Sequence, residues 1–165
     1  MRRLVFVLLC ALAAVPVAVA ASGAAGDGVL ELRNVIGTVT VAGSRGTLYG
    51  QMDKGRLVVT DPVPGDGQVL VSGYEWTHAV SDTVTAYGGR DIRFRVSGGK
   101  YKLAFVNGTG IDFTAVGIGT ATLAGDLRVD NAGDYALDGG KWLAVPQLTK
   151  RSVTFGLQTP TVTTP

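Results

Sequence analysis

The sequence predicts an all-β protein, an antiparallel β-meander that forms a sandwich or a barrel. Glycines recur every eight to ten residues on both sides of one interruption, at positions 28, 37, 46, 55 and 65 and then 88, 98, 108, 117 and 125. The runs between them are rich in Val, Thr, Leu, Ile and aromatic residues, which favour the half-buried surface of a strand. No window of about 11 residues keeps the apolar period of a helix without a glycine breaking it.

The first half of the chain predicts short strands at residues 29–32, 38–41, 47–49, 56–60 and 68–71. Pro62 and Pro64 lie between the last two of these runs. Proline has no backbone N–H to donate to a neighbouring strand, so we expect residues 61–67 to form a rigid loop.

The second half predicts hairpins, because apolar and polar residues alternate in 90–96 and again in 100–106. A two-residue loop at Gly98-Gly99 would place Phe94 opposite Leu103 and every apolar pair on one side. Three-residue loops at 107–109 and 117–119 would continue the meander, and further strands are expected at 142–145 and 152–157. In the alternative architecture, a β-solenoid, the glycines would mark the corners of parallel coils, but such short loops suit hairpins better.

The N-terminus predicts a signal peptide, residues 1–20. Arg2 and Arg3 precede an apolar run, and Ala18-Val19-Ala20 offers the small residues that a signal peptidase accepts. We expect a flexible N-terminal segment at 21–27, a single β domain at 28–157 and a disordered Thr/Pro tail at 158–165. The protein should therefore be secreted or extracytoplasmic, in the periplasm or cell envelope.

Cleavage after Ala20 would change the charge and the cysteine content of the protein. Of 15 basic residues, 13 would remain against 13 acidic ones, and Cys10 would be lost. A neutral chain argues against nucleic acid as a partner, and a chain without cysteine has neither a disulfide nor a thiol nucleophile. No later apolar run approaches the roughly 18–20 residues of a membrane span, so none is expected after cleavage.

No residue is predicted to be catalytic, and no metal or cofactor is expected. His78 is the only histidine, no Gly-x-Ser-x-Gly motif occurs, and a zinc site needs three or four ligands. His78 is expected in an exposed loop between the two halves of the chain. Aspartates recur every four residues at 126–138, where neighbouring glycines favour turns over a helix or a calcium loop.

The predicted hairpin places like charges together. Arg95 would lie opposite Lys102 with Arg93 beside them, and directly opposed like charges destabilise a sheet. Either Asp91 and Asp112 offset them in a solvated, mixed-charge face, or an anionic partner does so, such as a cell-wall polymer or an acidic glycan.

Tyr74 and Trp76 flank the interruption in the glycine period and complete the candidate ligand-binding set with Arg93, Arg95 and Lys102. Aromatic rings on a loop can stack on sugars, although a Trp beside a Tyr also commonly closes the end of a core.

Three stretches of the second half carry a family resemblance: residues 87–95, 98–101 and 110–117. They resemble a group of small exported, glycine-rich bacterial β proteins of unknown function. The resemblance implies export and an all-β fold, and it assigns no activity, ligand or catalytic residue. The zero net charge expected after cleavage, the absence of thiols, the single histidine and the regular glycine turns favour a non-enzymatic binding or structural module. The alternatives are a carboxylate-dependent hydrolase of envelope polysaccharide and a self-associating surface protein with an uncovered strand edge.

Overall fold

The computed structural model describes residues 25–156, which form strands, turns and loops without any helix. The predicted all-β, antiparallel class is confirmed. The predicted signal peptide at 1–20 and tail at 158–165 lie outside the described residues. The strands are β1 (Gly28–Thr60), β2 (Gly67–Ser72), β3 (Trp76–Ser81), β4 (Val84–Gly98), β5 (Tyr101–Gly125), β6 (Asp134–Leu137), β7 (Leu143–Ala144) and β8 (Arg151–Phe155).

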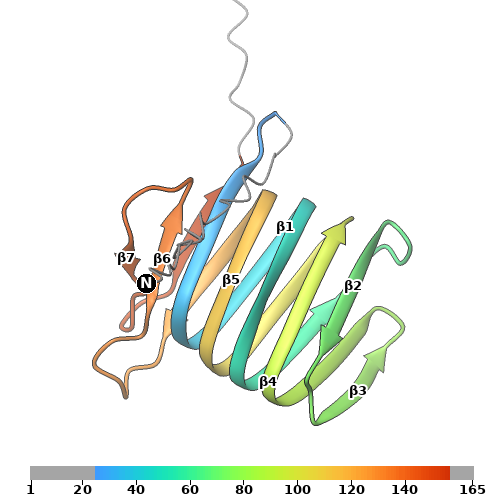
Figure 1. The fold of residues 1–165 in the computed structure, drawn as a ribbon, viewed down its shortest axis with the longest axis horizontal. Coiled ribbons are helices and arrows are strands. Elements are labelled where there is room, and N and C mark those ends of the chain that lie inside the picture. Colours follow the sequence, from blue (N-terminus) through green and yellow to red (C-terminus); the bar gives the residue numbers. More distant parts are fainter. Residues whose placement is uncertain (1–24, 157–165) are drawn as a thin grey trace, which may run out of the picture.

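All eight strands belong to one sheet in the order β2-β4-β1-β5-β8, with β3 beside β4, β6 beside β1 and β7 beside β6. β1 has 33 residues and would be about 110 Å long if straight. Figure 1 shows that the long strands instead bend over, so that each runs through a near layer and a distant layer. The two layers face each other as in a sandwich.

β1 and β5 wind around each other as an antiparallel coil. Phe113 of β5 lies between Leu32 and Gly50, which belong to successive passes of β1 through the near layer. Val41 of β1 likewise lies between Leu103 and Ala121 of β5 in the distant layer. Over these stretches each strand therefore has the other one on both sides. All pairings are antiparallel, so the solenoid with parallel coils is wrong.

The regular glycines lie where the strands bend from one layer to the other. Gly117 pairs with both Gly28 and Gly46, and the backbone at Gly46 has a φ of 118°. A methyl group there would overlap the carbonyl oxygen of Val116 and lie 2.8 Å from the Cα atom of Gly117. A second row forms at the other edge, where Gly37 pairs with glycines 108 and 125. The bends thus need residues without a Cβ atom, in a conformation that other residues rarely adopt.

The predicted hairpins at these glycines are wrong. After Gly98-Gly99 the chain enters the distant layer, and β4 pairs with β1, β2 and β3 but not with β5. The segments 107–109 and 117–119 lie inside the continuous strand β5. The alternation of apolar and polar residues fits both arrangements. Each strand buries the same side in both layers, and this does not depend on which strand lies beside it. A two-residue hairpin does form at residues 82–83, between Ser81 and Val84.

The core lies between the two layers. Phe105 of the distant layer packs against two rings of the near layer, with centroid distances of 5.0 Å to Phe94 and 5.7 Å to Phe113. Gly50 lies between these two near-layer residues in the sheet. A methyl group at Gly50 would overlap the carbonyl oxygen of Asp112 and lie 2.5 Å from the Cβ atom of Phe113, so the close approach of these two strands needs glycine.

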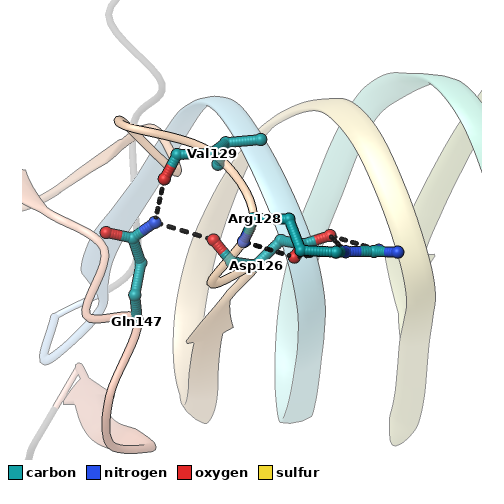
Figure 2. A network of polar contacts seen from close by, with 4 residues as sticks. All are labelled: Asp126, Arg128, Val129 and Gln147. Atoms are coloured by element: carbon teal, nitrogen blue, oxygen red, sulfur yellow. Dashed lines mark hydrogen bonds and ion pairs between the residues drawn. The ribbon is translucent and has the colours of Figure 1, made fainter.

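The two ends of the coil differ. Residues 126–150 close one end, where the side-chain amide of Gln147 donates hydrogen bonds to the carbonyl oxygens of Asp126 at 2.7 Å and Val129 at 2.6 Å (Figure 2). Tyr135 within this segment and Phe155 of β8 are both fully buried. The other end is formed by β2 and β3, which carry the outermost strand edges of the near and distant layers (Figure 1).

Candidate functional site

An open groove of about 500 Å³ crosses the outer side of the near layer. Strand alternation creates its lining, because Leu32, Leu48 and Phe113 point into the core and their neighbours therefore point outward. The lining side chains come from β1, β4, β5 and the loop before β7. They are Glu31, Arg33, Tyr49, Gln51, Arg93, Asp112, Thr114 and Trp142. The lining also includes Gly50 and three residues whose side chains are buried, Leu32, Phe94 and Phe113.

Outward-pointing side chains form two rows that run across the strands of the near layer. In one row, Tyr49 lies between Thr114 and Arg95, and Thr114 also pairs with Glu31. Arg95 lies beyond the residues that line the groove. In the other row, Gln51 lies between Asp112 and Arg93. The first row spans three inter-strand intervals, or about 14 Å, and the second spans two, or about 10 Å. The groove is therefore long enough for an extended ligand and presents hydrogen-bonding groups along its length.

Aromatic rings lie at two places in the groove. The guanidinium carbon of Arg33 lies 4.0 Å from the ring centroid of Trp142, which is a cation–π contact. This contact links the loop between β6 and β7 to the first pass of β1. Tyr49 lies on a central strand and is nevertheless 49% exposed. An exposed aromatic ring flanked by hydrogen-bonding side chains suits a ligand with both apolar and polar faces, such as a sugar.

Arg93 in the groove and Arg95 beside it form no ion pair with an acidic side chain in the described part of the chain. Arg93 has Gln51 and Ser72 as its cross-strand neighbours, and Arg95 has Tyr49 and Leu70. The groove carboxylate nearest in register, Asp112, is separated from Arg93 by Gln51, and its Oδ1 atom accepts a 2.9 Å hydrogen bond from the backbone N–H of Asn34.

The structure brings together only part of the set predicted from the sequence. Arg93 and Arg95 share one face, as predicted, but Lys102 lies in the distant layer between Ala42 and Thr60. The predicted Arg95–Lys102 pair is wrong, because it depended on the hairpin at Gly98-Gly99. The repulsion inferred from that pair does not exist.

The predicted aromatic pair lies at the open end of the coil. The Tyr74 ring is 5.1 Å from that of Tyr87, and the Trp76 ring covers Gly88, so both rings pack on β4. They are outside the groove. His78 is exposed, as expected, but it lies within strand β3 rather than in a loop.

Sequence reasoning missed Glu31, Arg33, Tyr49 and Trp142. Their signal is an outward position in a strand whose other side is apolar, as at Tyr49 after the buried Leu48. Many residues share this signal. It identifies the groove residues only when β5 is known to lie between two passes of β1, because that arrangement brings them together.

A second hollow, of about 530 Å³, lies on the distant layer and includes Lys100, Tyr101 and Lys102. The hydroxyl of Tyr101 is buried without a hydrogen-bond partner among the described atoms. Burial raises the pKa of this hydroxyl to about 12.

Other chemical features are few in the described part of the chain. Residues 25–156 contain no cluster of three or more His, Cys, Asp or Glu side chains suited to a metal ion. They also contain no helix able to cross a membrane. Comparisons of the chain with protein-family models, curated proteins and solved structures gave no match. The resemblance to exported glycine-rich β proteins therefore stays a prediction.

Proposed function

We propose that this protein is a non-enzymatic, extracytoplasmic module that binds an acidic glycan or wall polymer along the near-layer groove. The observation that carries the proposal is the joint presence of an exposed ring, Tyr49, and two arginines that form no ion pair in the described part of the chain, Arg93 in the groove and Arg95 beside it. An aromatic ring contacts the apolar face of a sugar, whereas arginine binds carboxylate or phosphate groups with paired hydrogen bonds.

The remaining lining supports the same reading. Glu31, Gln51, Asp112 and Thr114 offer acceptors and donors for hydroxyl groups along the groove. Trp142, held against Arg33, forms a platform at one end. The predicted signal peptide would deliver the protein to the compartment that contains such polymers, and N-terminal sequencing of the exported protein should begin at residue 21.

The test is binding to polygalacturonate, an acidic polysaccharide, with neutral dextran as the comparison, measured by affinity electrophoresis. Tyr49→Ala should lower affinity about tenfold, the effect of losing about 1.4 kcal/mol. Arg93→Ala with Arg95→Ala should weaken binding at least as much and reduce its dependence on salt.

The matched control is Lys100→Ala with Lys102→Ala, which removes the same charge from the distant layer. Equal losses in the two double variants would show that net charge, and not the groove, attracts the polymer. Absence of binding to polygalacturonate and to a phosphate-bearing wall polymer alike would refute the proposal.

A carboxylate-dependent hydrolase is the second candidate, because Glu31 and Asp112 line the same groove. Thr114 is directly opposite Glu31, so Asp112 is the diagonal neighbour of Glu31, with Cα atoms about 7–8 Å apart, and the two carboxyl groups can approach each other across the groove. Inverting glycosidases hold their carboxyl groups about 6.5–9.5 Å apart. Release of reducing ends by the wild type and its loss in Glu31→Gln would favour the hydrolase over the binding module.

A further inference from the structure

The open end of the coil has two unprotected strand edges. β2 and β3 each pair with β4 on one side, and no strand in the described part of the chain pairs with the other side of either. Each has six residues, so each edge is about 20 Å long. Unpaired N–H and C=O groups along such an edge can form hydrogen bonds with another strand.

Neither edge carries a charged residue or a proline, which are two of the usual protections against pairing. The sequences GQVLVS of β2 and WTHAVS of β3 contain no Lys, Arg, Asp, Glu or Pro. Leu70 is 52% exposed and Val80 is 60% exposed. β3 has a register shift between Ala79 and Ser81, whereas β2 pairs with β4 without any irregularity. β2 is therefore the straighter and more available edge.

The opposite end of the coil does not match this surface. There the edge strand β7 has only two residues, and β8 begins with Arg151 directly after Lys150. Residues 126–150 also cover that end. Head-to-tail assembly would thus place an uncharged edge against a short and basic one. An identical uncharged edge is the better partner.

We infer that two copies of this chain associate edge to edge through β2, about a two-fold axis perpendicular to the layers. Such an axis makes the two β2 strands antiparallel, which continues the pattern of the sheet, and places β3 of each copy near its equivalent. A register centred on Leu70 pairs Val69 with Val71 of the partner subunit and Gln68 with Ser72 of the partner subunit. The half-buried Val69 and Val71 thereby extend the core from one subunit into the next.

Sedimentation equilibrium of the purified protein at about 10–100 µM tests the association. The wild type should be a dimer, and Leu70→Lys, which adds a charge to the edge, should weaken dimerisation at least tenfold. Leu127→Lys is the matched control, because Leu127 is 66% exposed in the covering segment at the other end. It should leave the dimer intact. A monomeric wild type at 100 µM, or equal dimerisation of all three proteins, would overturn the inference.

Cross-linking tests the register. Leu70→Cys in a Cys10→Ser background has one cysteine, which would face its own copy across the two-fold axis. Opposed Cα atoms in antiparallel strands are about 4.5–5.5 Å apart, within the range of a disulfide. Mild oxidation should therefore yield a covalent dimer much faster than for Leu127→Cys in the same background. Equal rates for the two variants would refute pairing centred on Leu70.

Discussion

The glycine rows predict that one added methyl group at a bend should destabilise the protein severely. Gly46→Ala places a residue with a Cβ atom at a φ of 118°, which costs about 1–3 kcal/mol. The methyl group would overlap the carbonyl oxygen of Val116 and lie 2.8 Å from the Cα atom of Gly117. Overpacking of this kind costs a further 1–3 kcal/mol or so. We expect a loss of about 4 kcal/mol, a large part of a total stability of roughly 5–15 kcal/mol.

Gly65→Ala separates the cost of backbone strain from the cost of overpacking. Gly65 also has a positive φ, of 96°, but a methyl group there would meet nothing within 4 Å. It should cost only about 1 kcal/mol, because backbone strain is partly offset by lower entropy of the unfolded chain. Urea denaturation followed by circular dichroism measures both losses, at equal m-values. Equal losses would show that the close approach of strands at the bend does not require glycine.

Three further predictions concern titration and the covering segment. The pKa of Tyr101, raised to about 12 from 10.0, gives stability that is fully present below pH 10 and lost as the pH rises to 12. Tyr101→Phe should remove this loss, at most about 3 kcal/mol, in denaturation curves across that range. Gln147→Glu replaces a donor to two carbonyl oxygens by an acceptor, and should lower the free energy of unfolding by about 2 kcal/mol, measured by urea denaturation against Gln147→Met. Hydrogen bonds from Arg128 lower the pKa of Asp126 to about 2, and Arg128→Ala should return it toward 3.8 in a carboxyl NMR titration.

The strand content was readable from the sequence because it depends on local patterns. Alternation at Ile92, Phe94 and Val96 identifies which side of the strand is buried, and the structure buries all three. The glycines were also recognised correctly as breaks between straight runs. These signals come from neighbouring residues and do not depend on which strand lies alongside.

The pairing could not be predicted, because it depends on residues far apart in the chain. The apolar side chains of Phe94 and Leu103 would suit a hairpin pair. In the structure they lie apart, Phe94 beside Gly50 and Leu103 beside Val41, and both are buried there equally well. A glycine with positive φ serves a hairpin loop and a bend between layers equally well. The groove is lined by residues that only the strand pairing brings together, so Tyr49 and Trp142 could not be assigned to one site from the sequence. Arg93 and Arg95 could, since they lie two residues apart on one strand.

The interleaving of β1 and β5 has a consequence for how the protein is made. β4 pairs only with residues 47–60 of β1, whereas residues 28–46 depend on β5, which begins at residue 101, and on β6. A chain emerging N-terminus first therefore holds residues 28–46 without a native partner strand until β5 is made. Contacts such as Leu32 with Phe113 close a large loop, so folding should be slow and should start only after the return strand is available. Until then β1 is exposed to aggregation, and a chaperone that binds extended apolar segments would raise the yield of native protein.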